Sequence, residues 1–233
     1  MAKTTTNRPP VIPTDQPERK AKFNNLTAKG IYISLDISTS CIGVSVFDER
    51  GELLDLTHLR LEADRDVLVD YRYIPKANHF REFITKYRAN NIHGVFIEEP
   101  LSNTNQKTSR DTTNKLLRFN GICCYIIHQE LCVVPELISV YDVRFALCPE
   151  LRDYNVKEGK WVLQSGNKKK KTGMYTDATD AKMYIFKKIS KLYPDVKWVY
   201  DKKGLLHKYS LDMSDALAVG LAKLMQHEVL KKI

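Results

Sequence analysis

The sequence predicts one α/β domain built on a mixed five-stranded sheet that is flanked by helices. Three β-rich runs joined by short turns come first, which is typical of an antiparallel meander. Two apolar strands then alternate with helical stretches, and this order favours parallel strands added to the meander. The chain has 233 residues, of which 43% are hydrophobic, so it can bury one sizeable core.

The first 29 residues are predicted to form a flexible basic tail. They contain several prolines and scattered charges, and they show almost no apolar periodicity. Basic residues outnumber acidic ones there, so contact with nucleic acid is an alternative to a passive tail. The folded domain is therefore expected over residues 30–233.

The first half of the domain divides into strands and one helix. The expected elements are strands over 31–36, 41–47 and 53–61, a helix over 74–90 and a strand over 93–97. The last of these strands runs into Glu98, Glu99 and Pro100. Because proline cannot continue a central ladder, the chain must leave the sheet directly after the two glutamates.

A long helix is predicted over 105–131 in the second half of the domain. Gly121 falls in its middle, where glycine costs about 1 kcal/mol relative to alanine, so we expect close packing to explain it. The remaining expected elements are a strand over 137–141, a short helix around 143–146, an exposed hairpin or loop over 153–175, a helix over 177–192, a loop over 200–207 and a helix over 211–230.

The net charge of +9 is concentrated in one stretch. Residues 153–208 contain 14 Lys against 6 Asp and Glu, and a Lys-rich insertion is expected around 153–176. A concentrated positive field attracts a polyanion such as nucleic acid, although a hydrated lysine surface is the alternative.

The sequence also excludes several classes of protein. There is no apolar run of about 18 residues and no apolar signal region, so a cytoplasmic protein without a membrane span is expected. The five cysteines are odd in number and include no C-x-x-C pair, which favours reduced thiols that lie mostly in the core.

Four acidic residues lie where a solvated charge is not expected. Asp36 and Glu98 each end an apolar strand, where a carboxylate is costly unless it is paired or bound to a cation. Asp212 and Asp215 are expected on one face of the first turn of the last helix. If the four converge, neighbours about 5 Å apart repel by about 3 kcal/mol at an effective dielectric of about 20, so they need a counter-ion.

Such a set of ligands points to metal-dependent hydrolysis. Oxygen-only ligands select Mg²⁺ or Mn²⁺ over zinc. Two such ions about 4 Å apart can activate a water and stabilise the leaving oxygen of a phosphodiester. No Ser-His-Asp or Cys-His pairing suggests itself in the sequence.

Each acid also has a structural explanation when it is taken alone. Asp36 could form an Asx-turn with the serines that follow it, and Glu98 could be an ordinary solvated loop acid. Asp212 could cap the last helix, with Asp215 as its capping-box partner. Only the combination of all four points to a function.

Four segments, in order, resemble the RuvC family of Holliday-junction resolvases. Residues 35–43 resemble its first strand and turn, and 96–100 resemble its second acidic motif, with Glu98 aligned to the catalytic glutamate. Residues 115–131 resemble its long helix, including the glycine, and 212–222 resemble the helix that supplies the last two metal ligands. Each motif alone is weak, but four in sequence over 31–222 are fairly specific.

The resemblance implies an RNase H-like fold, a homodimer, and paired nicks across four-way DNA junctions in recombination or repair. It implies that Asp36, Glu98, Asp212 and Asp215 are catalytic and bind two Mg²⁺ ions, for which Mn²⁺ can substitute. The tail and the Lys-rich segment lack counterparts in the bacterial enzymes, so a phage or viral relative acting in the host cytoplasm is a reasonable expectation.

The DNA-binding candidates are basic residues near the predicted long helix, in the Lys-rich loop and on the penultimate helix. They are Lys107, Arg110, Lys115, Arg118, Lys168, Lys169, Lys170, Lys171 and Lys182. The resemblance implies that Lys182, or another base on the same penultimate helix, approaches the scissile phosphate. For the long helix, an ordinary polar outer face is the alternative.

Three other functions stay open at this stage. An actin-like or sugar-kinase-like ATPase begins with a similar Asp and Ser/Thr-rich turn, but it also needs a second Asp-Gly turn and a glycine-rich adenosine loop, and neither is found. A non-catalytic DNA-binding scaffold would be expected to lose at least one of the four acids. A less selective flap or branched-DNA nuclease cannot be separated from a junction resolvase by sequence.

Overall fold

A computed structural model describes residues 30–61, 72–100, 110–149, 152–155, 160–163 and 178–231. One sheet forms the centre of the domain, with the strand order β3-β2-β1-β4-β5. Its strands are β1 (Ile31–Ile37), β2 (Cys41–Asp48), β3 (Leu53–Arg60), β4 (Ile92–Glu98) and β5 (Glu136–Ile138). β1 to β3 are antiparallel, whereas β4 is parallel to β1 and β5 is parallel to β4. The predicted α/β architecture, a mixed five-stranded sheet flanked by helices, is confirmed.

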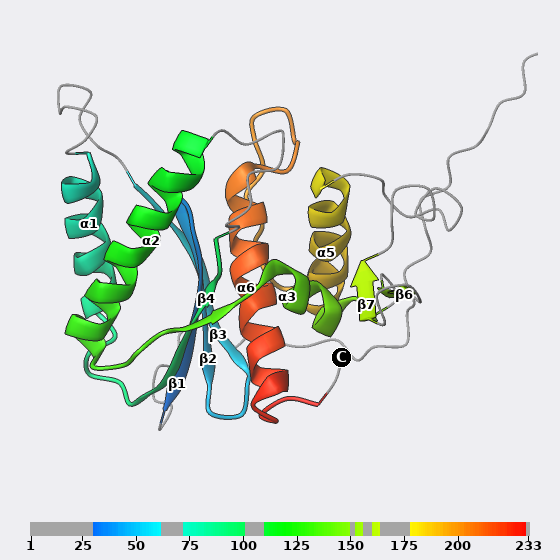
Figure 1. The fold of residues 1–233 in the computed structure, drawn as a ribbon, viewed down its shortest axis with the longest axis horizontal. Coiled ribbons are helices and arrows are strands. Elements are labelled where there is room, and N and C mark those ends of the chain that lie inside the picture. Colours follow the sequence, from blue (N-terminus) through cyan, green and yellow to red (C-terminus); the bar gives the residue numbers. More distant parts are fainter. Residues whose placement is uncertain are drawn as a thin grey trace, which may run out of the picture.

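Helices cover both faces of the sheet (Figure 1). The helices are α1 (Tyr73–Thr85), α2 (Arg110–Leu131), α3 (Val140–Leu147), α5 (Ala178–Leu192) and α6 (Lys208–Gln226). α1 and α2 pack on one face through a core that includes Phe80 and Phe119. α3, α5 and α6 pack on the other face, around Phe96 and Leu217. The sheet is therefore buried on both sides, as its nearly continuous apolar strands require.

Local capping explains two corrections to the predicted boundaries. The strand expected over 137–141 is only three residues long, because the side chain of Ser139 accepts a hydrogen bond from Asp142 N and starts α3 at Val140. The last helix begins at Lys208 rather than at residue 211, because His207 Nδ1 accepts a hydrogen bond from Tyr209 N. Both caps are local contacts that end the preceding segment.

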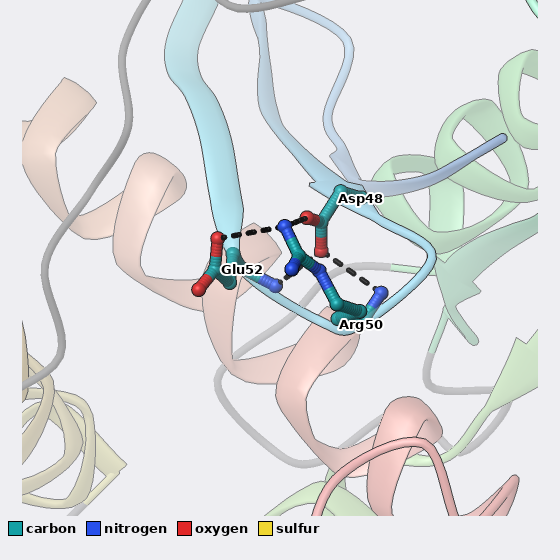
Figure 2. A network of polar contacts seen from close by, with 3 residues as sticks. All are labelled: Asp48, Arg50 and Glu52. Atoms are coloured by element: carbon teal, nitrogen blue, oxygen red, sulfur yellow. Dashed lines mark hydrogen bonds and ion pairs between the residues drawn. The ribbon is translucent and has the colours of Figure 1, made fainter. Parts of the chain in front are cut away.

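The turn between β2 and β3 lies at the opposite end of β2 from the turn that joins it to β1. Asp48, which is only 4% exposed, accepts hydrogen bonds from Arg50 N at 2.9 Å and Glu52 N at 2.8 Å (Figure 2). The Arg50 guanidinium pairs with the carboxylates of both Asp48 and Glu52. Gly51 has a φ of 79°, a conformation that glycine adopts without strain.

Several predicted features can be compared directly with the structure. The expected hairpin is present as β6 (Arg152–Asn155) paired with β7 (Lys160–Leu163). Gly121 is exposed, and a Cβ atom built there would have no atom within 4 Å, so the expectation that packing within the chain explains this glycine is wrong. All five cysteines are free, and Cys41, Cys123 and Cys148 are buried, as predicted. Within the described residues, every helix is too short or too polar to span a lipid bilayer. The tail 1–29, Lys107 and the lysines at 168–171 lie outside the described residues.

Candidate active site

Asp36 and Glu98 lie side by side because they end two neighbouring parallel strands. In the register of β1 and β4, Leu35 is opposite Ile97, so the next residues along each strand are adjacent. Side chains alternate along a strand, and Ser34 and Phe96 both face α6. Asp36 and Glu98 therefore face α6 as well, whereas the neighbouring Glu99 is exposed. The strands bring together the two carboxylates that were predicted to meet.

The two acids of α6 lie in its second turn, which corrects the prediction that they occupy the first. Because the helix starts at Lys208, Asp212 is inside it, and the alternative that Asp212 caps the helix is wrong. The spacing of three residues still places both carboxylates on one face. Asp215 is 7% exposed, so it faces the protein rather than bulk water.

Small residues hold α6 unusually close to the sheet. A Cβ atom added at Gly43 would lie 2.0 Å from the carbonyl oxygen of Asp212, and one at Gly220 would lie 2.4 Å from Ser34 Oγ. Ser34 Oγ and Ser45 Oγ both donate to the carbonyl oxygen of Ala216, at 2.9 and 3.2 Å. These contacts fix the height and rotation of the helix over β1 and β2, and with them the position of its two acids.

The four carboxylates influence one another electrostatically. Loss of water raises the pKa of Asp36 well above its usual value, and the charges of Glu98, Asp215 and Asp212 raise it further. Burial also raises the pKa of Glu98 to about 7, with the charge of Asp215 adding to the rise. The pKa of Asp212 is raised by burial, although a hydrogen bond with Cys41 and the charge of Lys182 oppose this. The cluster therefore carries more negative charge than its surroundings neutralise.

Three cations from separate helices act on this cluster, among them Lys208 at the start of α6, whose charge lowers the pKa of Asp212. Lys182 Nζ on α5 forms an ion pair with the Asp215 carboxylate. Burial lowers the pKa of Lys182, but the charges of Asp215 and Asp36 outweigh it and raise the pKa above its ordinary value. The charge of Arg144 on α3 lowers the pKa of Glu98. The Lys182 side chain is 42% exposed, so it can also reach a ligand that enters from solvent.

Sequence reasoning predicted Lys182 but missed four residues near this site, which are Ser34, Cys41, His58 and Arg144. Arg144 has a buried Nε without a hydrogen-bond partner in the described part of the chain. Cys41 hydrogen-bonds to Asp212, and the charge of Asp212 raises the pKa of His58 on β3, although burial lowers it more strongly. Ser34 offered a usable signal, because it precedes Asp36 by two residues and so shares its face of the strand. Arg144 and His58 offered none, since only tertiary packing brings them near the acids.

The structure describes three of the other candidate DNA-binding residues, which are Arg110, Lys115 and Arg118. Arg110 opens α2, which begins at the end of the sheet where β4 ends, the same end that carries the acid cluster (Figure 1). Lys115 pairs with Asp111 one turn earlier, and Arg118 is exposed farther along the helix. The structure therefore brings Arg110 to the end of the domain that holds the site, while Arg118 lies away from it along α2.

The chemistry of the four acids, though not their present spacing, fits a hard divalent cation. The four acids offer carboxylate oxygens alone, which suit Mg²⁺ or Mn²⁺, and their raised pKa values indicate a site that a cation would stabilise. Over the described ranges, however, no three Asp, Glu, His or Cys side chains stand close enough together to hold an ion. Ligation by all four would require Asp215 to turn away from Lys182.

Comparisons with known proteins give distant structural similarities only. Neither a protein-family model nor a curated protein matches the chain. RuvC of Thermus thermophilus, solved in complex with a Holliday junction substrate, is similar at 12% identity and a TM-score of 0.49, with 85% of this chain and 95% of that chain covered. The yeast mitochondrial Holliday junction resolvase is similar at 11% identity and a TM-score of 0.47, with 94% and 84% covered. Likeness at this distance concerns the fold alone.

Proposed function

We propose that this protein is a metal-dependent endonuclease that cuts branched DNA, with four-way junctions as its preferred substrate. The observation that carries the proposal is the convergence of Asp36, Glu98, Asp212 and Asp215 from three elements into one electrostatically coupled cluster. Four acids that repel one another are a stability cost that the cations of the protein offset in part and that a bound divalent cation would offset further. A purely structural cluster would be expected to carry one cation for each carboxylate.

In this proposal the four carboxylates hold two Mg²⁺ ions, and Mn²⁺ can take their place. The ions would activate a water and stabilise the leaving oxygen of the phosphodiester. Asp36 and Glu98 supply ligands from the rigid edge of the sheet, and Asp212 and Asp215 supply them from α6. The close contact at Gly43 keeps the helix, and so its two acids, within reach of the strands.

Lys182 and Arg144 act on the substrate rather than on the metal. When Asp215 serves as a ligand, the partly exposed Lys182 ammonium is available to a phosphate oxygen beside the cluster. Arg144, with its unpartnered Nε, can donate to a second oxygen. We expect the tail 1–29 and the lysines at 168–171, which lie outside the described residues, to add further phosphate contacts.

The substrate preference is tested by presenting several DNA structures to the same enzyme. Labelled four-way junction, flap, Y-fork and linear duplex DNA are incubated with the protein in Mg²⁺ or in EDTA, beside the variant Asp36→Asn. We expect paired symmetric nicks on the junction in Mg²⁺ only, and none from the variant. Equal cutting of linear duplex would refute junction selectivity, and preferred cutting of flaps would favour a flap nuclease. ATP turnover without nicking would favour the kinase-like alternative.

A further inference from the structure

A tight hairpin leads directly into α6 at the end of the domain that carries the acid cluster. It spans residues 199–207, is called the Tyr200 hairpin below, and is the orange loop above α6 in Figure 1. Tyr200 pairs with Leu206 across it, and Asp201 N donates to the carbonyl oxygen of Leu205 at 2.8 Å. Gly204 has a φ of 76° and donates to the carbonyl oxygen of Asp201, so the chain reverses direction over residues 201–204.

Hydrogen bonds within the Tyr200 hairpin and at its base hold it in one conformation. Asp201 Oδ1 accepts two backbone N–H groups of the turn, at 2.8 and 2.9 Å. At the base, the hydroxyl of the fully buried Ser210 accepts from Val199 N at 2.6 Å and donates to Val199 O at 2.8 Å. Ser210 precedes Asp212 by two residues on α6, so the hairpin has a fixed position relative to the acids.

A row of stacked rings also connects the Tyr200 hairpin to the acid cluster. The ring of His207, the last residue of the hairpin, lies 4.2 Å from that of Tyr209, and Tyr209 lies 4.6 Å from His58 of β3, measured between centroids. Burial lowers the pKa of His58 and the charge of Asp212 raises it, which places His58 near that acid. A ligand held by the hairpin would therefore lie beside the four acids.

The outer surface of the Tyr200 hairpin combines apolar side chains with cations. Tyr200 is 55% exposed and Leu205 is 63% exposed. Lys202 and Lys203 are exposed in the turn between them, and Lys208 is exposed at the start of α6. Because the turn itself engages the carboxylate of Asp201, the hairpin presents positive charge, an aromatic ring and an aliphatic side chain to solvent.

We propose that the Tyr200 hairpin contacts the DNA substrate beside the scissile phosphate, with the Tyr200 ring stacked on an unstacked base and Lys202 and Lys203 on the neighbouring phosphates. An aromatic face can stack on any base, and the cations neutralise the backbone. Bases at a branch point lack a continuous stack, whereas those of linear duplex are stacked on both sides. The inference rests on the proposed function and assigns part of its preference for branched DNA to one side chain.

Other occupants fit the Tyr200 hairpin less well. A stable protein interface buries about 800 Å² on each partner, which two apolar side chains on a narrow turn do not supply. Intact duplex DNA would use the lysines but would leave the Tyr200 ring and Leu205 without a contact. A strand with an unstacked base uses the cations and the apolar side chains together.

Binding of a four-way junction without cleavage tests the inference. The full chain with Asp36→Asn, in EDTA, is the parent protein, so the DNA stays intact. Adding Tyr200→Ala should weaken junction binding at least about fivefold, because it removes the stacking contact. Tyr200→Phe is the matched control, which keeps the ring and should bind within about twofold of the parent. Binding of linear duplex should change less than about twofold in both, and circular dichroism checks that each variant is folded.

The lysines of the Tyr200 hairpin have a separate readout. Replacing Lys202 and Lys203 together by alanine should reduce the slope of log K against log salt by about 1.5, because two phosphate contacts are lost. An unchanged slope would show that these lysines do not contact the backbone and would overturn that part of the inference.

Photo-crosslinking identifies the stacking contact directly. With 5-iododeoxyuridine at the branch point, we expect a crosslink to the peptide that contains Tyr200. The crosslink should persist in Tyr200→Phe and disappear in folded Tyr200→Leu, which keeps apolar area without a ring and so separates Tyr200 from the nearby Trp198.

Two results would overturn the inference and leave the nuclease proposal standing. One is a Tyr200→Ala chain that binds the junction as tightly as its parent, and the other is a crosslink that persists in Tyr200→Leu. Failure of the nuclease proposal has a different signature, which is a wild-type chain that crosslinks to the junction through Tyr200 but does not cut it in Mg²⁺.

Discussion

Two places in this molecule bury carboxylates at the ends of strands, and they differ in how the charge is compensated. At the β2–β3 turn, Asp48 accepts two backbone N–H groups and pairs with Arg50 (Figure 2). At the opposite end of β1 and β2, four acids share the ion pair of Lys182 and the charges of Arg144 and Lys208. One acid has several partners, whereas four acids have three cations between them among the described residues.

The comparison separates a structural acid from the acids that we propose to be functional. A buried carboxylate whose lone pairs are filled by its own turn stabilises that turn and has little left to offer a ligand. A group of carboxylates that raise one another's pKa values keeps its lone pairs available and gains free energy when a cation binds. Position at a strand end is common to both places, so it is the set of partners that distinguishes them.

The largest expected effect is on catalysis. Glu98→Gln should lower the rate of junction cleavage by about 10³-fold or more, because it removes a ligand for the ions that stabilise the transition state. Its matched control is Glu99→Gln, since Glu99 is adjacent in sequence but exposed. Single-turnover cleavage under saturating enzyme measures both. Comparable losses of cleavage rate in Glu98→Gln and Glu99→Gln would show that cleavage depends on the end of β4 in general rather than on the acid cluster.

Asp48→Asn should affect the stability of the protein rather than its catalysis. We expect it to lower the free energy of unfolding by about 1–3 kcal/mol, because a neutral amide accepts the turn's N–H groups and pairs with Arg50 less well. Cleavage should stay close to that of the wild type. Urea unfolding measures the change, and Asp36→Asn in EDTA serves for comparison. Asp36→Asn should be as stable as the wild type or more stable, since it relieves repulsion among the four acids. A large fall in its free energy of unfolding would contradict the distinction between the two places.

The smallest expected effect is a dependence of stability on pH in the absence of metal. Glu98 has a folded pKa of about 7 against an ordinary value of 4.5, so between these values the native state binds more protons than the unfolded state. The free energy of unfolding should therefore fall as pH rises from about 4.5 to about 7, by roughly 1–2 kcal/mol after solvent screening.

Thermal unfolding at several pH values checks this dependence. The melting temperature in EDTA should fall across that window, and Mg²⁺ should raise it more at pH 8 than at pH 5. Glu98→Gln should flatten the EDTA profile, whereas Asp48→Asn should leave its slope unchanged. A melting temperature of the wild type in EDTA that is constant, or that rises with pH, would mean that cations of the protein already neutralise the carboxylates.

Much of the fold was predictable because its signals are local. The alternation of apolar residues located β1 to β4, and Pro100 marked the end of β4. The helix starts that Ser139 and His207 set by capping were not predicted. A single capping hydrogen bond involves only a few atoms and leaves the pattern of apolar residues around it unchanged. Of the site, all four acids were predicted and are brought together, but their catalytic role stays a prediction until it is measured.

The sequence by itself determined which carboxylates end the strands, which pair shares a helix face, and that the chain forms a mixed sheet. These follow from the side-chain period of two residues in a strand and 3.6 residues in a helix, which relates each residue to its near neighbours in the sequence. Only the tertiary structure decided that α6 lies close enough for its acids to act on Asp36, that Lys182 and Arg144 flank them, and that Gly121 faces outward. Such facts depend on contacts between residues far apart in the chain, and no local pattern encodes the distance between them.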